Sequence, residues 1–314
     1  MSEITPKLSI SQVAEDLNLS IQGIHKKLKS LEITYYKVGN KAFITHNESK
    51  KLLNLKFKHM IVNSHIVKGG TGKTTSIQNI GACLNSYGAK VLFIDNDPQA
   101  NLSDSFKIDA ENTPVLIDCI KSNYEVKDCI HNICEGMDIL PSRIENVILD
   151  SEMQTKKIPI DKMFPSLLNN FISENSYDYV LIDCPPTMGH IVTAATLFSD
   201  LVLIPLNPNK FSTKGLNILK DEAKNLKKYY QHDVKYKVFL NKFSGNTILS
   251  DKAINTVMSD EYKRGNALST AIRRTQEIEN TTDAGLTLFS HLKQSDARED
   301  FRQLTKELFS ISFA

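Results

Sequence analysis

Lys68-Gly69-Gly70-Thr71-Gly72-Lys73-Thr74-Thr75 is the stretch that decides the fold. The stretch 60–67 before it is typical of a buried strand, and apolar residues recur at helical spacing from Ile77 to Leu84 after it. A glycine-rich loop between a strand and a helix lets backbone N–H groups close around an anion, which the helix dipole also favours. The stretch therefore predicts a phosphate-binding loop, in which Lys73 reaches the β- and γ-phosphates and the Thr74 hydroxyl binds Mg²⁺. We expect all eight residues to take part in nucleotide binding.

Further apolar runs read as strands of one sheet. The runs 90–95 and 179–183 each end in an acid, Asp95 and Asp183, and Asp97 follows the first of them closely. Acids at the carboxyl ends of parallel strands lie over bound phosphates in a doubly wound sheet. Two more strands are expected at 200–205 and 235–241. Strands that alternate with helices predict an α/β fold, a doubly wound and mostly parallel sheet of the P-loop NTPase type.

The loop departs from the usual phosphate-loop pattern, whose first glycine would fall at Val67. The double glycine preceded by Lys68 resembles the deviant Walker A motif of the ParA/MinD family instead. The resemblance covers roughly residues 60 to 310, with its motifs in order. It implies an ATPase that closes as a homodimer around ATP, with Lys68 acting as a catalytic cation on the partner's phosphates. A lysine just before the loop points away from its own γ-phosphate, which agrees with that role.

The same resemblance assigns roles to the strand-end residues. Asp97, in a segment like the family's D-x-D-P-Q, positions the attacking water, and Asp95 supports the magnesium shell. Asp183, in a segment like the family's D-x-P-P, holds Mg²⁺ through its water. Asn241, at the end of the run 235–241, contacts the adenine. The residues after Asn241 do not form the guanine-reading N-K-x-D, which favours ATP over GTP.

We expect residues 1–58 to form a separate basic domain in front of an ATPase domain at 59–314. They carry a net charge of +5, which leaves −3 for the rest of a chain whose total is +2. Ser9 with Gln12 predicts a capping box for a first helix, and Ser20 predicts the cap of a second. We expect the apolar stripe of the second helix to be buried, and it consists of Ile21, Ile24, Leu28 and Leu31. A third helix is expected around Asn47.

Two short helices followed by a hairpin predict a winged helix-turn-helix. The hairpin spans 35–44 and turns at Gly39-Asn40, and the order resembles MerR-like and excisionase-like DNA-binding modules. The second helix would present Gln22, His25, Lys26 and Lys29 to DNA, because such side chains reach base edges and phosphates. The alternative is a three-helix module that binds another protein.

The C-terminal part holds candidate cations for sequence-independent DNA binding, which needs only groups that neutralise phosphates. They are Lys263, Arg264, Arg273 and Arg274. A solvated helix surface is the alternative for each of them.

These features favour a plasmid or chromosome partition ATPase. By the resemblance, Mg·ATP closes the dimer, the dimer binds DNA, and a centromere-binding ParB-like partner triggers hydrolysis. The N-terminal domain would bind an operator and regulate the protein's own operon. We expect the protein to be cytoplasmic and nucleoid-associated. Two other readings stay open, an ATP-responsive transcription regulator and a MinD-like positioning ATPase on membranes.

A membrane role is disfavoured by several features. The chain has no run of roughly 18 apolar residues and no signal peptide. The last helix has an apolar stripe of Phe301, Leu304, Leu308 and Ile311, but acids accompany Arg302 and Lys306 on its polar face. We therefore expect it to pack on the sheet. The five cysteines form no C-x-x-C pair, which predicts reduced thiols, and residues 104–178 carry no motif that we can interpret.

Overall fold

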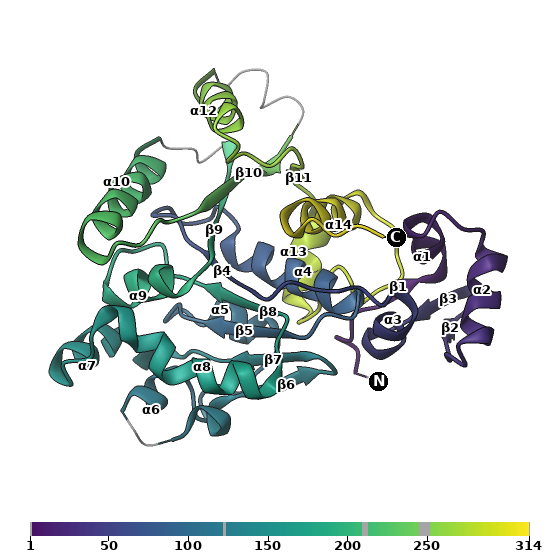
Figure 1. Cartoon of the computed structure of the whole chain (residues 1–314), viewed down its shortest axis with the longest axis horizontal. Coiled ribbons are helices and arrows are strands. Elements are labelled where there is room, and N and C mark those ends of the chain that lie inside the picture. Colours follow the sequence, from purple (N-terminus) through teal and green to yellow (C-terminus); the bar gives the residue numbers. More distant parts are fainter. Residues whose placement is uncertain (1, 122–123, 209–212, 245–251, 314) are drawn as a thin grey trace.

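A mostly parallel sheet with helices on both faces forms the main body, and a small N-terminal domain lies at one end (Figure 1). The computed structural model describes residues 2–121, 124–208, 213–244 and 252–313. The main body confirms the predicted α/β fold of the P-loop type.

The main sheet has eight strands in the order β11-β10-β9-β4-β8-β5-β7-β6. All neighbouring pairs are parallel except β6 with β7. The strands are β4 (Met60–Ser64), β5 (Val91–Asp95), β6 (His131–Cys134), β7 (Met137–Leu140), β8 (Tyr179–Asp183), β9 (Leu201–Leu206), β10 (Tyr236–Phe243) and β11 (Ile272–Arg273). The central strands are apolar throughout because helices cover both of their faces.

Register brings the strand-end acids together. Asp95 on β5 lies opposite Asp183 on β8, and Ser64 on β4 lies opposite Asp183 from the other side. The loops that carry the predicted motifs therefore leave the same edge of the sheet.

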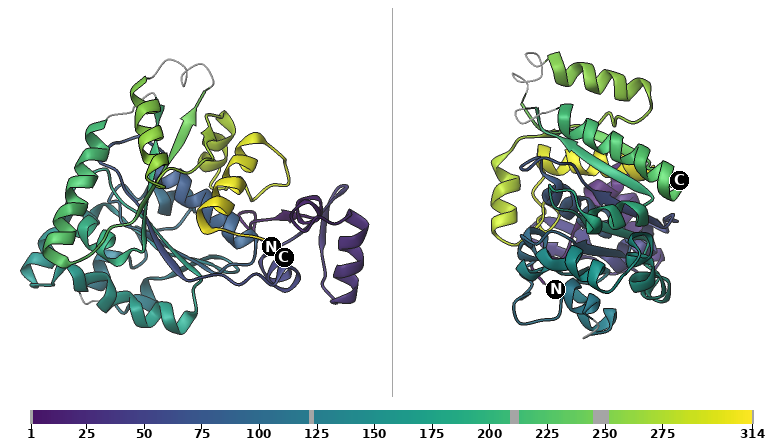
Figure 2. Two further views of the ribbon diagram at one scale, coloured as in Figure 1. Left: turned by 45° about the horizontal axis from the view of Figure 1, so that its top comes forward. Right: turned by 90° about the vertical axis from the view of Figure 1, so that its left-hand side faces the viewer.

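One face of the sheet packs against α4 and α14, and the other against α6 to α9. Phe93 and Leu181 belong to the first core cluster, whereas Ile94 and Ile182 belong to the second, as alternation along a strand requires. Helices α10 and α12 lie beside β9 and β10 (Figures 1 and 2). The α-helices of the body are α4 (Lys73–Ser86), α5 (Asn101–Ser105), α6 (Leu116–Ile120), α7 (Leu149–Thr155), α8 (Met163–Asn175), α9 (His190–Phe198), α10 (Thr213–Tyr230), α12 (Lys252–Lys263), α13 (Gln276–Asp283) and α14 (Asp296–Phe309).

The N-terminal domain has a three-stranded antiparallel sheet in the order β1-β3-β2 and three helices. Its elements are β1 (Leu8–Ser9), α1 (Ile10–Asp16), α2 (Ile21–Ser30), β2 (Tyr36–Val38), β3 (Lys41–Ile44) and α3 (His46–Leu53). The predicted capping box of Ser9 with Gln12 is present, Ser20 caps α2, and Gly39 turns the hairpin with a φ of 57°. The strand β1 was not predicted.

The stripe predicted for α2 is only partly buried. Ile24 and Leu28 are buried, whereas Ile21 and Leu31 are 52% and 49% exposed. The buried pair occupies the middle of a ten-residue helix, and its two ends extend beyond that core. The prediction for Ile21 and Leu31 was wrong for this reason.

The N-terminal domain is bound firmly to the body. The Lys7 amide donates to the Phe289 carbonyl at 2.8 Å, and the Lys41 ammonium donates to the Leu292 carbonyl at 3.1 Å. The Asn85 side-chain amide, near the end of α4, donates to Nδ1 of His46 on α3 at 3.2 Å. Because α4 begins in the phosphate loop, one helix links that loop to the N-terminal domain.

The C-terminal helix α14 packs on the body as expected, with Phe301 and Leu304 buried against the core that includes α4. It ends before Ile311, because Ser310 takes a left-handed conformation with a φ of 51°. Arg302 was expected on a polar face but is buried among acids of α1 and α14, which the sequence spacing could not reveal. In the described part of the chain, no helix is long and apolar enough to cross a membrane.

Candidate nucleotide-binding site

The phosphate loop joins β4 to α4 and depends on two glycines with positive φ. Gly70 has a φ of 72° and Gly72 a φ of 92°, a region that favours glycine. A Cβ at Gly72 would also collide with the side-chain amide of Asn241. Gly72 is the N-cap of α4, so the first N–H groups of the helix face the loop's concavity. Sequence and fold thus give the local geometry that binds phosphates.

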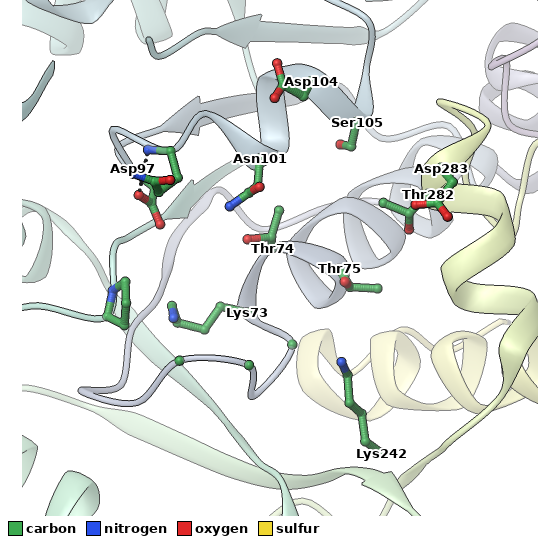
Figure 3. Close-up of a pocket in the computed structure, with 15 residues that line it drawn as sticks. Lys73, Thr74, Thr75, Asp97, Asn101, Asp104, Ser105, Lys242, Thr282 and Asp283 are labelled. Atoms are coloured by element: carbon green, nitrogen blue, oxygen red, sulfur yellow. Dashed lines mark hydrogen bonds between the residues drawn. The ribbon is translucent and has the colours of Figure 1, made fainter. Parts of the chain in front are cut away.

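A cavity of about 630 Å³ opens over the loop, at the carboxyl ends of β4, β5 and β8 (Figure 3). This volume is typical of ligand sites. Its lining residues are Gly69, Gly70, Gly72, Lys73, Thr74, Thr75, Asp97, Gln99, Asn101, Asp104, Ser105, Pro186, Lys242, Thr282 and Asp283. Lys73 and Asp97 are otherwise largely buried, so their charged groups meet solvent or ligand through the cavities that they line, which for Asp97 include a neighbouring cavity of about 400 Å³.

A hydroxyl and a carboxylate meet at the start of α4. The Thr74 hydroxyl donates to Asp183 Oδ2 at 2.5 Å, and Asp183 Oδ1 has no hydrogen-bond partner among the described residues. Burial, with the neighbouring Asp95 carboxylate, raises the pKa of Asp183 to about 8. A buried oxygen without a partner beside a hydroxyl is the kind of ligand set that Mg²⁺ takes. The residues present therefore fit a magnesium site.

Both carboxylate oxygens of Asp95 accept hydrogen bonds from the segment that follows β5. Its Oδ2 accepts from the Ser103 amide at 2.8 Å and the Ser103 hydroxyl at 2.7 Å, and its Oδ1 accepts from the Asp97 amide at 3.1 Å. Burial raises the pKa of Asp95 to about 7. These contacts fix the start of α5 and turn Asp97 toward the cavity. Any support that Asp95 gives a metal acts through this loop.

The two lysines of the motif lie in different environments. Lys73 is buried and lines the cavity, whereas Lys68 is exposed and is not among its lining residues. The Lys68 amide donates to the Ile66 carbonyl at 2.7 Å, which fixes the backbone just before the loop. The Lys68 side chain is therefore free to meet a group outside its own cavity.

Asn241 braces the loop from β10. Its side-chain amide donates to the Thr71 carbonyl at 2.8 Å, and its Oδ1 accepts from the Lys242 amide at 2.9 Å. Asn241 and Thr71 are both buried, and neither lines the cavity. Their expected contacts with the nucleotide stay predictions.

Comparison with known proteins agrees with this geometry. A family model described as an AAA domain matches residues 59–236. The sporulation initiation inhibitor protein Soj of Bacillus subtilis is 28% identical over 247 residues, which cover 77% of this chain and 94% of Soj. A ParA family protein of Chlamydia trachomatis is 29% identical over 258 residues, or 81% of this chain and 98% of that protein. This chain belongs to the ParA/Soj family of partition ATPases.

The fold extends to enzymes of other function. Cobyrinic acid a,c-diamide synthase from Mycobacterium smegmatis, with a bound ATP analogue and magnesium, superposes with a TM-score of 0.65 at 22% identity. The match covers 80% of this chain and 94% of that one. At this identity the likeness concerns the fold.

Sequence reasoning about this ParA-family site missed several residues that line the cavity. Lys242, Thr282 and Asp283 close one end, and Asn101 and Asp104 of α5 lie on another side (Figure 3). Lys242 directly follows the predicted Asn241, which is the only local signal for it. The α13 residues lie about 200 positions from the phosphate loop, and no motif marks them.

The candidate DNA-binding residues occupy two separate places. On α2, Gln22, Lys26 and Lys29 are exposed, and the half-buried His25 ring lies 5.0 Å from the Tyr35 ring. The second group lies at the far edge of the main sheet, beside β11 and the end of α12 (Figure 1).

Within that second group the cations differ. Lys263, Arg264 and Arg274 are exposed. Arg273 instead donates twice to Asp300, at 2.9 Å and 2.7 Å, and pairs with Asp296 at 2.9 Å. Its guanidinium is largely occupied within the chain, which argues against the prediction that it binds DNA.

Proposed function

We propose that this ParA-family ATPase is a DNA-partition switch that works as a Mg·ATP-dependent homodimer. The observation that carries the proposal is the separation of the two lysines. Lys73 faces the cavity of its own subunit, and Lys68 is exposed outside it. A cation so placed acts on a phosphate only if a second subunit brings its cavity opposite.

Within one subunit, different residues of the cavity would bind the phosphates, the metal and the attacking water. Lys73 and the backbone N–H groups of the loop would hold the β- and γ-phosphates, and Thr74 with Asp183 would hold Mg²⁺. Mg²⁺ held by these residues would supply positive charge that offsets the charge of the phosphates during phosphoryl transfer. Asp97 orients the attacking water and accepts its hydrogen bond, while Asp95 keeps Asp97 in place through the Asp97 amide.

In the closed dimer, Lys68 supplies the missing positive charge to the partner's phosphates. Stabilisation of charge on the transferring group is a large catalytic contribution. The chain alone should therefore hydrolyse ATP slowly, and a centromere-binding partner would accelerate the step. Hydrolysis would open the dimer and release it from DNA.

DNA would meet the dimer at two surfaces. Arg274, Lys263 and Arg264 offer exposed cations for sequence-independent binding. The N-terminal domain, with Gln22, His25, Lys26 and Lys29 on α2, would read an operator and regulate the protein's own expression. We assign Arg273 to holding β11 on α14 rather than to DNA, because Asp300 and Asp296 engage it.

The test measures ATP turnover and binding to a random-sequence duplex, for wild type, Lys68→Ala and the matched surface variant Lys162→Ala. Wild type and Lys162→Ala should hydrolyse ATP and bind DNA only with ATP. Lys68→Ala should bind ATP but lose turnover by at least about 100-fold, as expected for loss of a cation on the transferring phosphoryl group.

Other outcomes would favour the rival readings. If DNA binding is equal with and without ATP, and Asp97→Ala still represses the protein's own operon as wild type does, a transcription regulator would be favoured. ATP-dependent sedimentation with anionic vesicles would favour a membrane-positioning ATPase. The apolar side of α14 already packs on the body, which supports the DNA reading.

A further inference from the structure

A second, smaller cavity adjoins the nucleotide site. It has a volume of about 150 Å³ and shares Thr75, Lys242, Thr282 and Asp283 with the larger cavity. Its remaining wall is formed by Arg274, Thr275, Ile278 and Glu279. The nucleotide site therefore extends from the phosphate loop into a space between strand β10 and helix α13.

The residues that line the two cavities indicate which end of the site would hold the γ-phosphate and which the nucleoside. Asp97 and Lys73 mark the γ-phosphate end, because Lys73 reaches the β- and γ-phosphates in such loops. Lys242, Thr282 and Asp283 lie toward the opposite end, with Thr74 and Thr75 between (Figure 3). The α-phosphate and the ribose must therefore lie beside Thr75 and Lys242.

Lys242 has an unusual backbone conformation, with a φ of 57°. Its amide donates to Asn241 Oδ1, and the Asn241 amide in turn donates to the Thr71 carbonyl of the phosphate loop. Left-handed geometry in a residue other than glycine is strained, and such strain gathers at functional sites. Here it turns the lysine side chain back over the loop, where a Cβ on Gly72 would lie 3.6 Å from Lys242 Cε.

The ammonium of Lys242 is available for a ligand. It lines both cavities, the residue is half-buried, and no described residue forms an ion pair or hydrogen bond with this ammonium. A partly desolvated cation at the edge of an anion site interacts strongly with a phosphate oxygen.

We propose that Lys242 is a positioning residue that binds the α-phosphate and ribose of the nucleotide, so that β10 and α13 form the nucleoside end of the site. This inference rests on the proposed ATP-dependent function. Because the contact exists in ADP and ATP alike, it sets nucleotide affinity rather than the rate of phosphoryl transfer.

The experiment measures dissociation constants of ADP, ATP and inorganic pyrophosphate by calorimetry, for wild type and Lys242→Met. ADP and ATP should bind about tenfold more weakly to the variant, the loss expected from one charge-assisted contact. Pyrophosphate, which lacks the nucleoside end, should bind within about twofold of wild type because Lys73 and the loop remain. In turnover assays KM for ATP should rise by about the same tenfold factor, with kcat within about twofold.

Three variants separate binding from folding and from general charge. Lys242→Arg should recover most of the ADP affinity, because it keeps the cation. Lys242→Gly removes the backbone strain, so it should melt no lower than wild type and still bind ADP weakly. Lys237→Met removes another half-buried lysine of the same strand, whose ammonium donates to the Gly265 carbonyl, and should leave ADP binding unchanged.

Unchanged ADP affinity in Lys242→Met, or an equal loss in Lys237→Met, would overturn the role of Lys242 and leave the proposed function standing. A wild type that binds neither ADP nor ATP would overturn the proposed function itself, and the role of Lys242 with it.

Discussion

Asp16 of α1 and Arg302 of α14 form a buried ion pair that joins the N-terminal domain to the ATPase body. The Asp16 Oδ1 to Arg302 Nη1 distance is 2.6 Å, and each side chain is 1% exposed. The Tyr87 hydroxyl, at the end of α4, donates to Asp16 Oδ2 at 3.2 Å, and Lys306 also contacts Asp16. One carboxylate therefore connects α1 with both α4 and α14.

Asp16→Ala should destabilise the chain by about 3 kcal/mol, because it leaves the buried Arg302, and the half-buried Lys306 beside it, short of a counter-charge. Urea unfolding of the full chain measures this. Glu15→Ala is the matched control, since Glu15 binds the same guanidinium but is 65% exposed. It should cost less than about 1 kcal/mol. Similar losses for both variants would contradict the account of the interface.

Stability should fall as pH rises between 6.5 and 8.5 in the absence of nucleotide. Burial raises the pKa of Asp95 to about 7 and of Asp183 to about 8, above the unfolded value of about 3.9. The folded chain thus holds protons that the unfolded chain has released, and this stabilisation is lost as pH passes through the folded pKa values. His46 and His65, whose pKa values burial lowers, act in the opposite direction only below about pH 6.5.

Urea unfolding at several pH values in that window measures the slope, and Asp183→Asn should make it shallower. Mg²⁺ with ATP should flatten it as well, because bound metal favours the ionised carboxylate. A slope that Asp183→Asn leaves unchanged would show that other groups titrate.

Gly72→Ala should destabilise the ligand-free chain by about 1–3 kcal/mol, because alanine is strained at a φ of 92° and its Cβ collides with the Asn241 amide. Gly69→Ala in the same loop has open space at the Cβ position and should change stability by less than about 0.5 kcal/mol. Thermal or urea unfolding of both variants provides the comparison. If Gly69→Ala costs as much, the loop is sensitive for another reason.

Selection of DNA sites from a random duplex pool tests the N-terminal domain. The full chain should enrich a defined sequence, and Gln22→Ala should change the preferred bases, since amide side chains read base edges. Lys29→Ala should weaken binding to all sequences alike and reduce the salt slope by about one. Lys56→Ala, an exposed lysine outside α2, is the control. Enrichment of no sequence would leave protein binding as the better reading of this domain.

Local features of the chain were predictable because their causes are local. The capping box of Ser9, the glycines of the phosphate loop and the acid-ended strands each depend on neighbours within a few residues. The burial of Arg302 was not predictable, because Asp16 lies 286 positions away along the chain. The strands β6 and β7, which end one side of the sheet, were missed because 131–140 is a short hairpin around Gly136 that carries no motif.

The central claim is that Lys68 acts on the phosphates of the other subunit, and mixing two inactive variants tests it most directly. Lys68→Ala keeps Asp97, and Asp97→Ala keeps Lys68, so a mixed dimer contains one complete site. An equimolar mixture should recover about a quarter of the wild-type ATP turnover, because roughly half of the dimers are mixed and each holds one such site. A mixture that stays as inactive as each variant alone would contradict action across the dimer.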